Sequence, residues 1–142
     1  MPSIEEKVEE YFKKKLDENN IRHYGKTEKI NPAIAKALKN ADSKSGGSGC
    51  NFPDIQMMLE NSNARRIPVM VEAKGTKKKL EKVDKTGAIV GVTYYDSDGK
   101  PGKDGKPSHL KGEPNFSAVK DYAVNGAVHY GNAVLSEGTY KE

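Results

Sequence analysis

Near the start of the chain, apolar residues recur at three- and four-residue steps, a spacing that places them on one side of a helix. This apolar stripe consists of Ile4, Val8, Tyr11, Phe12 and Leu16. Ser3 is the predicted N-cap, and Glu6 three residues later completes a capping box. The pattern predicts a helix over residues 3–19.

Shorter patterns follow this first helix. Asn31 and Pro32 have the residue types of an N-cap and a first helical position, and they predict a helix that continues to Leu38. Three runs rich in apolar and β-branched residues predict strands. These strands cover residues 54–59, 67–73 and 88–95.

The helical period returns over residues 116–135, with Asn115 as the predicted N-cap. Two segments have loop composition instead. Residues 44–49 read KSGGSG, which is typical of a flexible connector, and residues 96–112 are rich in glycine, proline and lysine. The order of helix, strands and helix predicts an α/β or α+β protein.

Composition narrows the class of protein further. A chain of 142 residues is long enough for one well-cored domain, so we expect residues 1–142 to form a single domain. The 24 Lys and Arg residues against 20 Asp and Glu give a net charge of +4, which is compatible with a polyanionic partner. No apolar run approaches the roughly 18 residues that cross a bilayer. The lone Cys50 excludes an intrachain disulfide and a cysteine-rich metal site, and it fits a reduced intracellular compartment.

The segment with the clearest chemistry begins at Pro53-Asp54 and continues, 18 residues after Asp54, with Glu72-Ala73-Lys74. Side chains alternate between the faces of a strand, so Glu72 and Lys74 point the same way. If the two strands pair as antiparallel neighbours, the start of one meets the end of the other. Asp54, Glu72 and Lys74 are then expected to meet at one edge of the sheet.

Two carboxylates beside an ammonium group form an oxygen-rich cation site. Mg²⁺ prefers one or two carboxylates and takes further ligands from water and substrate phosphate. A bound Mg²⁺ lowers the pKa of its water and polarises a phosphoryl oxygen, and Lys74 is placed to orient the water or to stabilise the developing charge. The arrangement suits phosphodiester hydrolysis. An ordinary ion pair at the end of a strand is the alternative.

This pattern resembles the PD-(D/E)XK nuclease superfamily, in which Pro-Asp is followed by (D/E)-x-K at the end of an apolar strand. The resemblance implies a restriction-endonuclease-like three-layer α/β core, with a mixed central sheet flanked by helices. It also implies that Asp54 and Glu72 are metal ligands and that Lys74 is the catalytic lysine. The backbone carbonyl of Ala73 is expected to complete the metal site.

Many members of the superfamily add a glutamate from the first helix to the metal site. Glu5 fits this role best by its spacing to the apolar stripe, and Glu9 fits nearly as well. Simple solvated helix residues are the alternative for both. The choice between the two stays open at the level of the sequence.

Residues 123–133 are similar to the segment that follows the catalytic strands in the N-terminal nuclease domains of type IIG and type I-like restriction–modification enzymes. Many relatives carry Gln-x-x-x-Tyr there, whereas this chain has Asn125 and His129 at that spacing. We expect both side chains to line the site and contact DNA, although surface positions are equally compatible. The lysine cluster directly after the site is expected to contact DNA phosphates, with a solvated surface as the alternative. Its members are Lys77, Lys78 and Lys79.

The resemblance implies a metal-dependent endodeoxyribonuclease of a prokaryotic restriction–modification system, acting on double-stranded DNA in the cytoplasm, away from membranes. The expected cofactor is Mg²⁺, with Mn²⁺ as an alternative. Family members carry a further core strand after the last helix, so we expect the chain to be truncated before that strand. Further domains (methyltransferase, helicase or target recognition) or a homodimer partner are then expected.

Two alternatives to this interpretation remain. One is a non-catalytic basic domain of the same fold that binds nucleic acid or supports assembly. The other is a nuclease of this fold that acts on RNA or on branched DNA.

Overall fold

The central sheet contains three antiparallel strands in the order β1-β2-β3. They are β1 (His23–Gly25), β2 (Ile55–Glu60) and β3 (Arg66–Val71). The structure is a computed structural model, and it describes residues 1–44, 46, 52–97 and 102–140. Ile55 at the start of β2 lies opposite Val71 at the end of β3. This register decides where the candidate chemistry of the chain comes together.

The two strands that carry the Asp54 and Glu72 motifs are confirmed, with bounds shifted by one or two residues. The sequence did not predict β1, because a three-residue strand carries too little pattern to recognise. We also expected a mixed sheet, but every strand pair within the described residues is antiparallel. The part of the predicted fold class that the structure confirms is an α/β protein with helices packed against a sheet.

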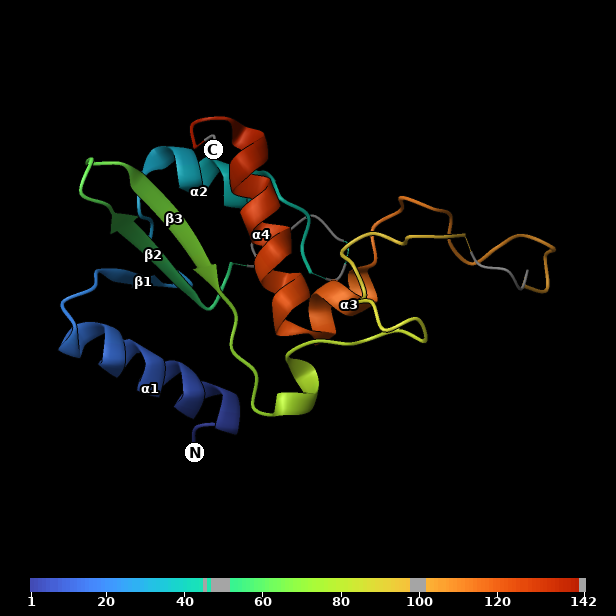
Figure 1. The fold of residues 1–142 in the computed structure, drawn as a ribbon, viewed down its shortest axis with the longest axis horizontal. Helices are drawn as coiled ribbons and strands as arrows, with labels where there is room; N and C mark the ends of the chain where they lie inside the picture. The colour runs from blue at the N-terminus through green and yellow to red at the C-terminus, as the bar shows by residue number, and fades with distance from the viewer. Residues whose placement is uncertain (45, 47–51, 98–101, 141–142) are drawn as a thin grey trace.

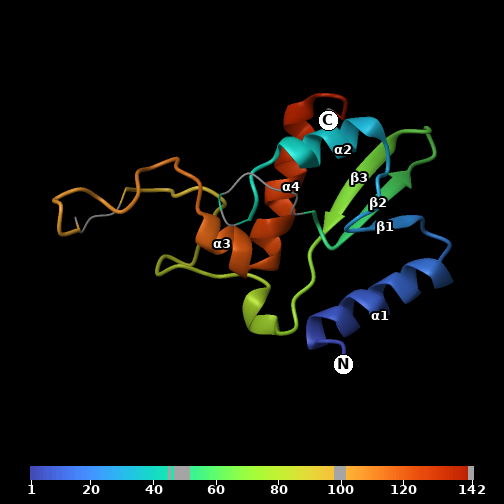
Figure 2. The same ribbon diagram turned by 180° about the vertical axis from the view of Figure 1, so that it is seen from behind.

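Helices cover both faces of this sheet. Figures 1 and 2 show α1 (Ile4–Glu18) on one side and α2 (Pro32–Asn40) with α4 (Ala123–Glu137) on the other. The predicted capping box of Ser3 and Glu6 is confirmed at the start of α1. Asn31 caps α2 through its side chain, which accepts a hydrogen bond from the N–H of Ile34, and Pro32 is the first helical residue.

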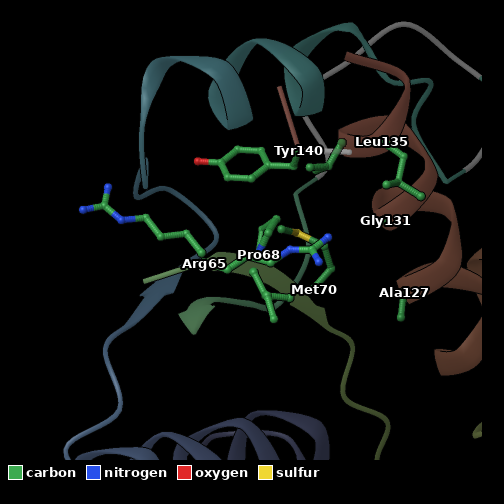
Figure 3. Close-up of a pocket in the computed structure, with 10 residues that line it drawn as sticks. Arg65, Pro68, Met70, Ala127, Gly131, Leu135 and Tyr140 are labelled. Atoms are coloured by element: carbon green, nitrogen blue, oxygen red, sulfur yellow. The ribbon is translucent and has the colours of Figure 1, made fainter. Parts of the chain in front are cut away.

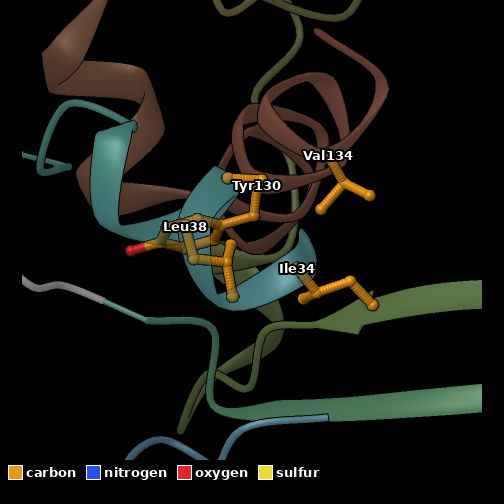
Figure 4. Close-up of a cluster of buried hydrophobic side chains, with 5 residues drawn as sticks. Ile34, Leu38, Tyr130 and Val134 are labelled. Atoms are coloured by element: carbon orange, nitrogen blue, oxygen red, sulfur yellow. The ribbon is translucent and has the colours of Figure 1, made fainter. Parts of the chain in front are cut away.

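Two apolar clusters hold these layers together. On the α1 side, Leu16 packs with Ile55 and Met57 of β2. On the other side, α2 and α4 pack against each other through a larger cluster, to which Met58 and Met70 of the sheet add partly buried contacts. The buried members of this cluster are Ile34, Ala37, Leu38, Tyr130 and Val134 (Figure 4). Alternating side chains of β2 therefore serve both faces, as expected of a strand covered on two sides.

The predicted strand over residues 88–95 is wrong. This run forms only isolated bridges, Val83 with Ile89 and Thr93 with Pro114. The tight turn at Asp84, whose carboxylate accepts the N–H groups of Thr86 and Ala88, leaves no length for a ladder on one side. On the other side the N–H of Tyr94 donates to the carbonyl of Glu113 and the N–H of Asn115 donates to the carbonyl of Val92, which closes one bridge between Thr93 and Pro114 and no longer ladder. β-branched composition therefore produced an extended segment without a partner strand.

The predicted single helix over residues 116–135 is divided in two. α3 (Phe116–Asp121) ends at Tyr122, whose backbone is extended, with φ −116° and ψ 132°, and α4 then begins. The N–H of Val124 donates to the carbonyl of Leu80 at 3.0 Å, so a tertiary contact satisfies the new helix start. Asn115 caps α3 as predicted.

Several sequence expectations fall outside the described residues. They include Cys50 and most of the KSGGSG connector. Between η1 (Lys77–Lys79) and α3 lies a long segment, and its described part extends away from the sheet in both views (Figures 1 and 2). Among the helices of the described residues, none has the length and hydropathy that a membrane span requires.

Candidate functional site

Asp54 and Glu72 meet where β2 begins and β3 ends, as the antiparallel pairing predicts. Each lies one residue outside the Ile55–Val71 pair of the ladder. The N–H of Ala73 donates to Asp54 Oδ2 at 2.7 Å, which joins the two motifs directly. The Asp54 and Glu72 side chains are only 3% and 1% exposed. Two carboxylates are therefore held in a low-dielectric setting, where each needs a positive partner.

Each of these two acids has a lysine partner that the sequence did not indicate. Lys26 Nζ lies 2.9 Å from Asp54 Oδ1, and Lys44 Nζ lies 2.9 Å from Glu72 Oε2. The hydrogen bond to Asp54 raises the pKa of Lys26. Lys26 follows the unpredicted β1, and Lys44 follows α2 in a loop, so no periodic pattern points to either residue.

The first helix adds two more carboxylates to this edge. Oxygens of Glu5, Glu9 and Asp54 all lie within 4.8 Å of one another. Lys26 Nζ also contacts Glu9 Oε1, at 3.3 Å. Glu5 and Glu9 lie one helical turn apart, so both face the sheet edge. Of the two glutamates between which the sequence left the choice open, the structure brings both to Asp54.

Lys74 lies in a pocket of about 340 Å³ that shares Glu5 with the acidic group. Its Nζ donates to the carbonyl of Lys120 at 3.3 Å, at the end of α3. A Cβ at Gly75 would lie 3.3 Å from the backbone nitrogen of Glu5, so α1 begins in close contact with the segment after β3. The other residues lining this pocket are Thr76, Lys79, Lys120 and Asp121.

Glu72 is the most confined group of the site. Within the described part of the chain, its Oε1 is buried without a hydrogen-bond partner. Burial raises the pKa of Glu72, against the opposing effects of the Lys44 hydrogen bond and of the more distant Lys74 charge. On the α4 side, a Cβ at Gly126 would lie 3.1 Å from Glu72 Cγ, so a side chain there would make this carboxylate shift by a few tenths of an ångström. Glu72 therefore has an unused acceptor and little space to move.

Tyr130 lies on the α4 side of the same region. The Lys44 ammonium sits 5.9 Å from the centre of its ring. Its hydroxyl is buried and finds no hydrogen-bond partner among the described residues. Burial, followed by the negative charge of Glu72, raises the pKa of Tyr130 and keeps the phenol neutral. The sequence placed Tyr130 on the apolar face of its helix, and nothing there indicated a polar neighbour.

Two residues predicted to line the site have other partners. Asn125 is buried, and its Nδ2 donates to the carbonyl of Val90 at 2.7 Å, which fixes the long segment before α3. His129 Nε2 lies 2.7 Å from the carbonyl of Asp42, in a different pocket between α2 and α4. Neither contact involves Asp54 or Glu72. Their predicted DNA contacts find no support in these positions.

The lysine cluster predicted to contact phosphates forms η1, and its three members are exposed. Lys79 lines the Lys74 pocket and lies 4.0 Å from Asp121. The cluster therefore stands beside the candidate site. Lys120 lines the same pocket, although no motif in the sequence points to it.

A separate apolar pocket of about 470 Å³ lies between β3 and α4. Figure 3 shows Pro68 and Met70 on the strand and Gly131 and Leu135 on the helix, with the Tyr140 ring above. None of the acidic residues or lysines described above lines it. The hydrophobic surface of this pocket and the charged groups at the sheet edge are thus different places in the fold.

No protein-family model matches the chain, and the searches among curated proteins and among solved structures found no significant match.

Proposed function

We propose that this protein is a metal-dependent endodeoxyribonuclease that hydrolyses phosphodiester bonds of DNA. The observation that carries the proposal is the convergence of Asp54 and Glu72 at the sheet edge, with Glu5 and Glu9 of α1 beside them. This combination of a helix, an antiparallel strand pair and a Pro-Asp…Glu-x-Lys motif supports a restriction-endonuclease-like core. The setting that goes with it is a prokaryotic restriction–modification system.

The donor set fits a hard divalent cation such as Mg²⁺ or Mn²⁺. Carboxylate oxygens are the protein ligands that these ions prefer. Three of them, from Glu5, Glu9 and Asp54, lie within 4.8 Å of one another, and Glu72 Oε1 is a further buried acceptor without a partner in the described residues. When bound, the cation would lower the pKa of a coordinated water and polarise the phosphate. The role of the Ala73 carbonyl stays a prediction, since the contact found at Ala73 involves its N–H.

The positive groups next to the acids suit a DNA phosphate. Lys74, Lys79 and Lys120 border one pocket with Glu5, so a phosphate held by these ammonium groups would lie next to the carboxylates. Hydrolysis adds the oxygen of water to phosphorus and breaks one phosphorus–oxygen bond, and the leaving oxygen takes a proton. Lys74 is positioned to stabilise the negative charge that develops on the phosphate.

A non-catalytic nucleic-acid-binding domain is the second candidate. The observation that favours it is the pairing of both buried acids with lysines, Asp54 with Lys26 and Glu72 with Lys44. Such pairs neutralise buried carboxylates without any metal. A metal titration separates the two candidates, because a purely structural ion-pair network has no need of a divalent cation.

The test is cleavage of supercoiled plasmid with Mg²⁺ or Mn²⁺ by the wild type and by the variants Asp54→Asn and Lys74→Ala. Asparagine is chosen because its amide oxygen can still accept the hydrogen bond of Ala73 N–H. Lys14→Ala, an exposed lysine of α1, removes the same charge away from the edge and serves as the control. We expect nicking by the wild type and the control and none by the two site variants. Full activity of Lys74→Ala would contradict the role assigned to that lysine.

A further inference from the structure

Lys26 places a positive charge among the carboxylates of α1 and β2. Its Nζ contacts Asp54 Oδ1 at 2.9 Å and Glu9 Oε1 at 3.3 Å. The two acids are 3% and 12% exposed, whereas the Lys26 side chain is 52% exposed. The ammonium therefore reaches the acids from solvent, and the Lys26 side chain itself is not buried in the core.

Several hydrogen bonds, two of them from a buried side chain, hold the turn that carries Lys26. Gln56 of β2 is only 1% exposed, and its Nε2 lies 3.4 Å from the carbonyls of both Gly25 and Glu28. The Glu28 carboxylate accepts the N–H of Gly25 at 3.0 Å, and the N–H of Glu28 donates back to the Gly25 carbonyl. A buried amide is unfavourable unless it is hydrogen-bonded, and the carbonyls of this turn are the partners of the Gln56 amide. The position it fixes is that of Lys26 next to Asp54.

A single ammonium is an incomplete partner for this group of acids. Lys26 contacts Asp54 and Glu9, while Glu5 is the third member of the set within 4.8 Å. Among the contacts of Lys26, one ammonium faces carboxylates that repel one another at this separation, and the next lysine, Lys74, lines the pocket on the Glu5 side of the group. A divalent cation supplies one more unit of charge and accepts more oxygen ligands than an ammonium can donate hydrogens.

A second observation points to a missing ligand in the same region. Glu72 Oε1 is buried without a partner in the described residues, although Lys44 satisfies the other oxygen. Glu72 lies opposite Asp54, one position beyond the Ile55–Val71 pair, and the neighbouring Ala73 N–H is bonded to Asp54, although the Glu72 oxygens are not among those that lie within 4.8 Å of one another. An unpaired carboxylate oxygen at this depth is costly unless something else uses it.

We infer that Lys26 holds the place of a divalent cation between Asp54 and Glu9 in the metal-free protein, and that metal binding and the release of Lys26 are one exchange. The inference rests on the proposed metal-dependent function. It adds to that function a lysine that keeps the acids paired until the cation arrives. The released ammonium then stands at the rim of the site, where it adds to the positive surface offered to a phosphate.

The first test compares Mn²⁺ affinity by calorimetry for the wild type, Lys26→Met and the control Lys15→Met. Methionine keeps an unbranched side chain that ends at the ε position and removes the ammonium group with its charge. Lys15 is a matched control, since it pairs with Glu18 at 2.9 Å on α1 and is 48% exposed. We expect Lys26→Met to bind Mn²⁺ about tenfold more tightly, equivalent to about 1.4 kcal/mol, because the cation no longer competes with an ammonium. Lys15→Met should bind like the wild type.

The second test uses the wild-type protein alone, so that it does not depend on the folding of a variant. An amine-acylating reagent and mass spectrometry give the labelling rate of Lys26 with and without Mn²⁺. Release of the ammonium from Asp54 and Glu9 predicts faster labelling in Mn²⁺, while the rate at Lys15 stays constant. An unchanged Lys26 rate would overturn the exchange.

The two proposals fail in different ways. If Lys26→Met binds Mn²⁺ as the wild type does or more weakly, or if neither protein binds it, the exchange is refuted. A wild type that cleaves plasmid together with such a result leaves the nuclease proposal standing. Tighter Mn²⁺ binding by Lys26→Met in a protein that cleaves no DNA would support the exchange and refute the nuclease.

Discussion

Replacing Gly126 by alanine would put a methyl group where α4 passes the Glu72 side chain. The new Cβ would lie 3.1 Å from Glu72 Cγ and 3.3 Å from its Cδ and Oε2, inside the 3.4 Å at which ordinary contact begins. Glu72 is 1% exposed, and its Oε2 is bonded to Lys44. The carboxylate must therefore shift by a few tenths of an ångström within a closed space. Gly131 of the same helix is the matched control, since a Cβ there meets no described atom within 4 Å.

The two substitutions share the helix-propensity gain and differ in the contact with Glu72. Alanine is favoured over glycine in a helix interior by about 1 kcal/mol. Gly131→Ala should therefore raise the free energy of unfolding by about that amount, which corresponds to a rise in Tm of about 4 °C for a domain of this size. At Gly126 the same gain is offset by a weakened Lys44–Glu72 hydrogen bond, and leaving a buried acceptor unsatisfied costs about 1–3 kcal/mol. We expect Gly126→Ala to be about 1–3 kcal/mol less stable than Gly131→Ala.

The assay is urea denaturation of both variants and the wild type, followed by Mn²⁺ titration of each. Gly126→Ala should also bind Mn²⁺ more weakly, because the displaced carboxylate belongs to the proposed donor set, and Gly131→Ala should bind normally. Equal stabilisation by the two substitutions, with unchanged Mn²⁺ affinity, would refute the claim that α4 confines Glu72.

Three further predictions concern buried groups and the start of α1. Burial raises the pKa of Glu72 above 4.5, so folding favours the protonated carboxyl, and the stability of the metal-free wild type falls as pH rises through that pKa. Glu72→Gln should therefore be more stable than the wild type near neutral pH. Urea denaturation should show that this advantage vanishes below pH 4.5. Tyr130→Phe removes a buried hydroxyl without a described partner, so thermal melting should show no loss and a gain of up to about 1 kcal/mol; a loss of that size would mean that the hydroxyl is bonded. Ser3→Ala removes the N-cap of α1 and should destabilise the protein by about 1 kcal/mol in urea denaturation. An unchanged midpoint for Ser3→Ala would mean that the first turn of α1 adds nothing to the stability of the fold.

The features predicted correctly from the sequence are those fixed by local chemistry. Ser3 and Asn31 cap their helices with the partners that their spacing indicates. The apolar runs around residues 55–60 and 66–71 form paired strands, and the antiparallel register follows once the two are neighbours. The meeting of Asp54 with the Glu72 motif depends only on that register, so a one-dimensional pattern was sufficient to predict it.

The features that were missed depend on tertiary contacts. The predicted last helix is interrupted at Tyr122, where the N–H of Val124 donates to the carbonyl of Leu80, a residue distant in the sequence, and not to a carbonyl of the preceding helical turn. Lys26 and Lys44 reach the acids from loops, where no period indicates which way a side chain points. The predicted strand over residues 88–95 has strong β propensity, but propensity cannot supply a partner strand.

The way α1 packs on the sheet determines how long Glu5, Glu9 and Asp54 stay together as one acidic group. Leu16 is the only residue of this helix that is fully buried, while Ile4 and Tyr11 of its apolar stripe are 67% and 64% exposed. An element with so little buried surface is expected to detach transiently at a free energy below that of global unfolding. Each detachment carries Glu5 and Glu9 away from Asp54, whose own strand stays paired. Amide hydrogens of α1 should therefore exchange with solvent sooner than those of β2, and the lifetime of the assembled acidic group is the residence time of one helix on the sheet.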